Sequence, residues 1–276
     1  MSASLTHHLE RVAGSDGIDP AAMSLPEARR IARAYFVDAN GYASAPRLLT
    51  YPEAQRKLGK SERATLGLTL APADASGWNV CLWSTASCRA ACVLNTAGNA
   101  RYATVRDARV VRTRFLAEYP QAFVTLATAE LIRAVERYGG EIDYRPNVAS
   151  DVRWERIVPA WFGLRGVRVY DYTKAPRAHR TPTRNYRLVY SVSERPTSTD
   201  EALAYLQSGG TTAVVFATRR GAVLPTTWNG FPVIDADADD ARTDDPSGVV
   251  VGLRAKGAAI GTVGTVDGFV KPNTAS

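Results

Sequence analysis

The chain has 276 residues, a formal net charge of +7 and a sequence pI near 9.4. Its 45% hydrophobic and 22% charged residues are typical of a folded globular protein and exclude a disordered or collagen-like chain. No stretch is apolar for long enough to cross a bilayer and the N-terminus lacks a signal peptide, so we expect a cytoplasmic protein with no membrane partner.

Two helix-start signals mark the first part of the chain. Ser24-Leu-Pro-Glu27 is a capping box with proline in the first turn, and it predicts a helix that ends near Asn40-Gly41. Thr50-Tyr-Pro-Glu53 predicts a second, short helix that ends near Gly59. We therefore assign residues 1–62 to an N-terminal helical extension and residues 63–276 to an α/β core.

From about Thr65 onward, short apolar runs alternate with helical patterns. Helices are predicted to begin at a cap at Thr104, at Pro120, near Val152 and at a cap at Ser198. Strands are predicted over residues 66–71, 141–146, 167–172, 186–191, 212–217 and 248–254. This alternation predicts a mainly parallel sheet covered by helices, as a partial or irregular (β/α) barrel, with an open doubly wound sheet as the alternative.

All three cysteines, Cys81, Cys88 and Cys92, lie in the loop that follows the first predicted strand. Cys88 and Cys92 are four residues apart and share one face if a helix begins near Ser87. Three thiolates in one loop indicate a metal or an iron–sulfur cluster. A [4Fe-4S] cluster held by three cysteines leaves one iron open to a small-molecule ligand.

Other interpretations of the cysteines remain open. Structural zinc needs a fourth ligand, for which His179 is the candidate, and catalytic zinc would use a water with Glu194 or Asp171 as the base. The thiols could instead pack as small buried hydrophobes. A disulfide would leave one cysteine over.

Ligands of parallel α/β proteins bind at the carboxyl ends of the strands. The polar residues that follow the predicted strands are Asn147, Ser150, Asp151, Asp171, Thr173, Lys174, Ser193, Glu194, Arg219, Arg220 and Lys256. We expect them to form a charged pocket beside the cysteine loop. Lys174, Asp171, Asp151 and Asn147 are the candidate catalytic or ligand-contacting residues.

Charged clusters suggest further partners. Arginines between Arg101 and Arg114, and basic residues between Lys174 and Arg184, form either solvated surfaces or sites for a phosphate-bearing ligand. The acidic run Asp235-Ala-Asp-Ala-Asp-Asp240 suggests a solvated turn rather than a magnesium or calcium site. The net charge permits binding to nucleic acid.

Motifs of this chain resemble those of two protein families. The cysteine loop, Ser150-Asp-Val-Arg-Trp-Glu155, Tyr170-Asp-Tyr-Thr-Lys174 and Trp228-Asn-Gly-Phe-Pro-Val-Ile-Asp235 together resemble the actinobacteriophage family called gene product 88, from about Thr65 to Val270. This resemblance implies a phage protein in the host cytoplasm. It implies no particular activity.

The second resemblance is to radical S-adenosylmethionine enzymes, which also place a three-cysteine loop after a strand and before a (β/α) succession. Those enzymes usually have the spacing CxxxCxxC, whereas this chain has CxxxxxxCxxxC. The resemblance implies a [4Fe-4S] cluster on Cys81, Cys88 and Cys92 and S-adenosylmethionine as a cofactor. The leading hypothesis is therefore a phage-encoded iron–sulfur protein, radical-S-adenosylmethionine-like or redox-active. The alternative is a basic protein that binds nucleic acid or a host factor, with structural zinc or no metal.

Overall fold

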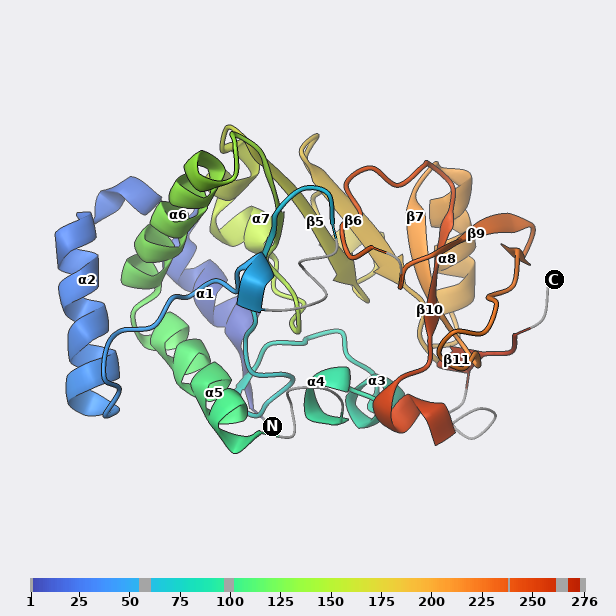
Figure 1. The fold of residues 1–276 in the computed structure, drawn as a ribbon, viewed down its shortest axis with the longest axis horizontal. Helices are drawn as coiled ribbons and strands as arrows, with labels where there is room; N and C mark the ends of the chain where they lie inside the picture. The colour runs from blue at the N-terminus through green and yellow to red at the C-terminus, as the bar shows by residue number, and fades with distance from the viewer. Residues whose placement is uncertain (1, 55–60, 97–101, 238, 262–267, 274–276) are drawn as a thin grey trace.

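A sheet of mainly parallel strands forms the centre of the protein (Figure 1). The computed structural model describes residues 2–54, 61–96, 102–237, 239–261 and 268–273. The sheet has nine strands in the order β2-β4-β5-β6-β7-β10-β9-β8, with β11 beside β7. Their bounds are β2 Thr65–Gly67, β4 Ile142–Arg145, β5 Val167–Thr173, β6 Tyr186–Ser191, β7 Thr211–Phe216, β8 Thr227–Trp228, β9 Phe231–Asp235, β10 Val250–Arg254 and β11 Val270–Lys271.

The strand order confirms an α/β protein with a mostly parallel sheet. From β2 to β7 each strand pairs in parallel with the next strand of the sheet in chain order, so these crossovers all proceed in one direction. The strands β8 and β9 form an antiparallel hairpin, and Thr50 makes an isolated antiparallel bridge to Gly67 of β2. Among the described strands, the end strands β2 and β8 do not pair, so no closed barrel forms.

Four helices cover the end of the sheet near β2 and β4: α1 Leu5–Ala13, α2 Leu25–Arg33, α5 Ala103–Glu118 and α6 Pro120–Arg137. The capping prediction for α2 is confirmed, because Ser24 Oγ accepts the Glu27 N–H at 3.4 Å. This helix continues as a π-helical turn over Ala34–Ala39. Leu5, Leu9 and Phe36 belong to the same buried hydrophobic cluster as the strands β2 and β4.

The remaining α-helices lie elsewhere along the chain. They are α3 Ala86–Ala90, α4 Val93–Thr96, α7 Trp154–Ile157 and α8 Ser198–Gln207, and β1 (Ala3–Ser4) pairs with β3 (Trp78–Asn79) in a small second sheet. α8 packs on β6 and β7 through Ala202 and Leu206. Within the part of the chain described here, no helix is both long and apolar enough to span a membrane.

Some predicted elements differ from the structure for local reasons. The helix predicted over 152–162 divides into α7 and a 3₁₀ turn, Pro159–Gly163, because Pro159 has no N–H to continue the ladder. α5 begins at Ala103, one residue before the predicted cap Thr104. The helix predicted after Thr50 shows only a 3₁₀ turn, Pro52–Ala54, and its remaining residues, up to the predicted end near Gly59, lie outside the described residues.

The prediction of a solvated acidic turn over Asp235–Asp240 is wrong for Asp240, whereas Asp235 is exposed. Residues 239–246, which we call the acidic strap, follow β9 and contact side chains of β4 and β5. Asp240 is 1% exposed and contacts Arg145 at 3.3 Å and the Tyr170 hydroxyl at 3.0 Å. Asp244 pairs with Arg168 near the start of β5. Strand arginines therefore neutralise these carboxylates.

Candidate functional site

One cavity of about 310 Å³ lies at the carboxyl ends of the strands, next to the cysteine loop. All three cysteines line it. The strand ends contribute Arg145, Asn147, Ser150, Asp151, Tyr172, Thr173, Lys174, Ser191, Val215, Leu253, Arg254 and Lys256 to its wall. In Figure 1, α3 and α4 lie below the strands, beside the short 3₁₀ helix Gly257–Gly261 that follows β10.

Hydrogen bonds fix the backbone of the cysteine loop. Asn79 Oδ1 accepts the Cys81 N–H at 2.9 Å, and Thr85 Oγ1 caps α3 by accepting the Cys88 N–H at 3.3 Å. Glu194, which follows β6, binds this loop from outside. Its carboxylate accepts from the Thr85 hydroxyl at 2.7 Å and from the Ser87 N–H at 2.8 Å. Burial opposes ionisation of Glu194, but these hydrogen bonds hold its pKa below the ordinary value.

The three cysteines are thiols that no disulfide joins. They lie close enough to interact electrostatically with one another. Burial raises the pKa of Cys81 to about 12, and its thiol donates to the Ala149 carbonyl at 3.3 Å. Burial also raises the pKa of Cys92, while the Leu94 and Asn95 N–H groups and the Lys174 charge favour its thiolate.

Among the described residues, the side chains around the cysteine loop do not form a metal site. In the described ranges, no three His, Cys, Asp or Glu side chains are positioned to hold a metal ion. His179, the predicted fourth zinc ligand, packs its ring against Trp83 at 4.6 Å and is not among the cavity residues. The structure therefore supports neither the iron–sulfur nor the zinc prediction directly.

A buried polar network supports the wall of the cavity. Asp171 is fully buried, and its carboxylate accepts from the backbone N–H and the side-chain amide of Asn147, both at 2.8 Å. Asn147 Oδ1 in turn accepts from the Ser150 hydroxyl at 2.7 Å and from the Val152 N–H at 2.9 Å. Burial raises the pKa of Asp171 to about 7, against the Arg180 charge and the Asn147 hydrogen bonds, which lower it.

Asp151 is held in the same network. It accepts from Thr173 Oγ1 at 2.7 Å, from the Lys174 N–H at 2.9 Å and from Arg180 at 2.7 Å. Arg180, whose side chain is fully buried, also binds Glu155. The polar groups of Asn147, Asp151 and Asp171 are thus engaged in holding the loops that follow β4 and β5.

Lys174 differs from these three candidates. Its side chain is half-buried in the cavity wall, with Nζ 5.6 Å from the centre of the Phe269 ring. No carboxylate of the described chain lies within ion-pair distance of Nζ. The neighbouring cations Arg254 and Lys256 both pair with Asp237. Lys174 is therefore the candidate best placed to contact an anionic ligand.

The structure places only some of the predicted strand-end residues in the cavity. Asn147, Ser150, Asp151, Thr173, Lys174 and Lys256 line the cavity, whereas Asp171, Ser193, Glu194, Arg219 and Arg220 do not. Sequence reasoning missed Arg145, which lies at the end of β4, and Ser191, which ends β6. Both are the last residues of their strands, whereas the sequence prediction considered only residues that follow the strands.

The first arginine run is solvent-exposed at Arg106 and Arg114, whereas Arg109 and Arg112 are half-buried. Arg112 Nη1 donates to the Thr69 carbonyl at 2.9 Å, and Arg114 Nε donates to the Ser76 carbonyl at 3.0 Å. Arg109 lies beside Cys92 and donates to the Leu94 carbonyl at 3.4 Å. These arginines connect α5 to the segments on either side of the cysteine loop. Arg101 lies outside the described residues.

A family model described as gene product 88 matches residues 43–268. The chain belongs to this family. The match confirms the phage family that the motifs resemble. It covers the cysteine loop, every strand from β2 to β10 and all of the cavity residues except Phe269. Searches of curated proteins and of solved structures found no match, so the site has to be interpreted from its own residues.

Proposed function

We propose that this gene product 88 protein is an iron–sulfur protein whose [4Fe-4S] cluster is held by Cys81, Cys88 and Cys92. The observation that carries the proposal is the gathering of all three cysteines on one cavity with the polar ends of the strands. Three thiolates leave one iron of such a cluster open. When bound, the cluster supplies electron transfer and a coordination position for a small ligand.

The donor set fits an iron–sulfur cluster chemically. Thiolate sulfurs are the usual ligands of such clusters, and backbone N–H groups near Cys81 and Cys92 would stabilise the thiolates. Buried thiols are protonated until a cation binds, and metal binding then releases the protons. A rotamer change moves a cysteine sulfur without moving its backbone, and cluster binding would require the three thiols to reorient in this way.

The cavity favours a ligand that carries an anionic group. Lys174, Lys256, Arg145 and Arg254 line it, and Asp151 is the carboxylate among the lining residues. S-adenosylmethionine carries a carboxylate and is one ligand of this class. We assign ligand contact to Lys174, and we assign Asn147, Asp151 and Asp171 to positioning of the loops around it.

A partial (β/α) barrel is the finer fold that accompanies this proposal. Its support is the chain-order pairing from β2 to β7, together with the position of the cysteine loop after the first strand of that series. This arrangement is similar to that of radical S-adenosylmethionine enzymes, although the cysteine spacing differs. Enzymatic activity would follow from a substrate that binds at the open iron.

Serine replacement of each cysteine tests the proposal. After anaerobic reconstitution with iron and sulfide, Cys81→Ser, Cys88→Ser and Cys92→Ser should each lose most of the iron that the wild type retains. Full iron content in all three variants would reject the ligand assignment. One equivalent of zinc and no iron in the wild type would show a zinc site instead.

Lys174→Ala tests the assigned ligand contact separately. The variant should keep the cluster but bind S-adenosylmethionine at least tenfold more weakly, as measured by equilibrium dialysis. Lys271→Ala is the matched control, because this lysine lies in β11 and is not among the cavity residues. Equal affinity in the wild type and Lys174→Ala would remove Lys174 from the binding site.

A further inference from the structure

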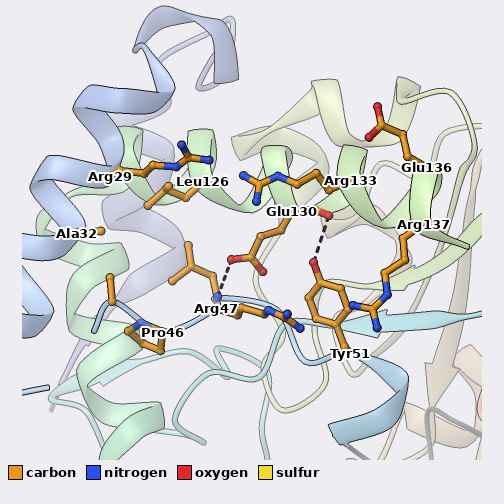
Figure 2. A pocket seen from close by; sticks show the side chains of 12 residues that line it. Arg29, Ala32, Pro46, Arg47, Tyr51, Leu126, Glu130, Arg133, Glu136 and Arg137 are labelled. Atoms are coloured by element: carbon orange, nitrogen blue, oxygen red, sulfur yellow. Dashed lines mark hydrogen bonds between the residues drawn. The ribbon is translucent and has the colours of Figure 1, made fainter. Parts of the chain in front are cut away.

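A second cavity, of about 660 Å³, lies between α2, the segment over residues 45–51 and α6. It shares no lining residue with the cysteine cavity. Figure 2 shows arginine side chains directed into it from all three elements. We call it the arginine cleft and define it by Arg29, Arg47, Arg133 and Arg137.

The arginine cleft carries excess positive charge. Its lining has four arginines against two glutamates, Glu130 and Glu136. Among the described residues, Glu53 on the rim pairs with Arg137 at 3.1 Å. Arg29 and Arg133 are exposed and make no ion pair with any described residue. Two guanidinium groups therefore face the opening with their donors available.

Internal contacts hold the arginine-bearing segment in place. The Glu130 carboxylate accepts the Leu48 N–H at 2.8 Å and the Leu49 N–H at 3.0 Å. Arg47 lies over the Tyr51 ring, 4.6 Å from its centre, and Arg137 lies 5.9 Å from the same centre. The Glu130 carboxylate therefore binds the backbone of residues 45–51 and does not point into the opening of the cleft. The cleft is thus pre-organised before any ligand binds.

We propose that the arginine cleft binds a ligand with two or more adjacent phosphate groups, either a single nucleic-acid strand or a nucleoside polyphosphate. Guanidinium groups match phosphate oxygens in pairs of parallel hydrogen bonds. Separate arginines on opposite walls of a wide cleft suit several phosphates better than one. The net charge of +7 also favours a polyanion. This site is independent of the cysteines.

The test uses the full-length protein and two double variants of equal charge. Arg29→Ala/Arg133→Ala removes two exposed cleft arginines that make no hydrogen bond to any described residue, so folding should be unaffected. Arg165→Ala/Arg220→Ala removes two exposed arginines that do not line the cleft. Circular dichroism confirms that each variant is folded.

Two probes distinguish the sources of phosphate. Fluorescence anisotropy with a labelled single-stranded DNA measures strand binding, and isothermal titration with ATP measures nucleotide binding. The cleft variant should bind the relevant probe at least tenfold more weakly, and the control should bind like the wild type. For single-stranded DNA, the slope of log K against log salt should fall by about 1.4, or roughly 0.7 for each lost contact. Absence of binding of both probes to the wild type, or equal affinity in the cleft variant, would overturn the proposal.

Discussion

Asp171 is the residue on which the polar network beneath the cysteine cavity converges. Its pKa of about 7 lies above that of an unfolded aspartate, so the folded protein binds the extra proton between about pH 4 and pH 7. This contribution to stability is present below pH 4 and is lost as the pH rises through 7. Relative to Asp171→Asn, the wild type should lose up to about 1.4 kcal/mol of unfolding free energy for each pH unit in this window.

Urea unfolding of both proteins at pH 5, 6, 7 and 8 would measure the effect. The comparison with Asp171→Asn isolates this carboxyl, because other titrating groups are common to both chains. Unfolding free energies that change in parallel over the whole range would show that the pKa of Asp171 is not raised.

Arg180 is the residue whose loss should cost the most stability. Its buried guanidinium binds Asp151 and Glu155, so Arg180→Met leaves two largely buried carboxylates without their cation. The expected loss is about 3–5 kcal/mol in denaturant unfolding. Arg184→Met, at an exposed position in the same basic run, should change stability by less than about 0.5 kcal/mol. A small effect of Arg180→Met would show that the two carboxylates find other partners.

At the scale of elements, the cysteine helix α3 depends on Glu194. Glu194→Gln weakens two hydrogen bonds and removes a negative charge from the start of α3, which should cost about 1–2 kcal/mol. Hydrogen exchange at residues 86–90 should become faster by at least tenfold. Glu118→Gln, at the exposed end of α5, is the control. Unchanged exchange in Glu194→Gln would show that Thr85 alone caps α3.

The turn before β5 requires glycine. Gly166 has a φ of +77°, and a Cβ there would lie 2.3 Å from the Gly140 carbonyl oxygen and 2.7 Å from Val135 Cγ1. Gly140 has a φ of +104° but open space around its Cβ position. Both alanine variants incur backbone strain, so Gly166→Ala should cost about 1–3 kcal/mol more than Gly140→Ala in thermal or urea unfolding. Equal costs would show that the turn shifts to accept the side chain.

Elements with strong local signals could be predicted from the sequence. α6 begins at Pro120 and ends before Gly139-Gly140 as predicted, because both signals are local. The β8–β9 hairpin was missed, although Asn229-Gly230 is a hairpin signal and both residues have positive φ. α1 lies within the predicted N-terminal helical extension, but its bounds were not predicted, although Leu5, Leu9 and Ala13 recur at every fourth position.

At the scale of the whole molecule, the carboxyl ends of the parallel strands form the cysteine cavity. The acidic strap neutralises Arg168 near the start of β5 and Arg145 at the end of β4. The sequence predicted where the cavity would form, because parallel strands bring their carboxyl ends together. It could not predict which polar residues face the cavity, because Asp171 and Arg180 are buried in the core, where they bind residues distant in the chain. The arginine cleft was not anticipated for the same reason.

The metal and sulfide content of protein purified without oxygen tests the central claim most directly. After reconstitution, the account predicts about four irons and four sulfides per chain and a broad absorption band near roughly 400 nm from sulfur-to-iron charge transfer. A protein that binds neither iron nor sulfide under these conditions, and shows no such band, would contradict it. The three cysteines would then be packing residues in the wall of a cavity that contains no cluster.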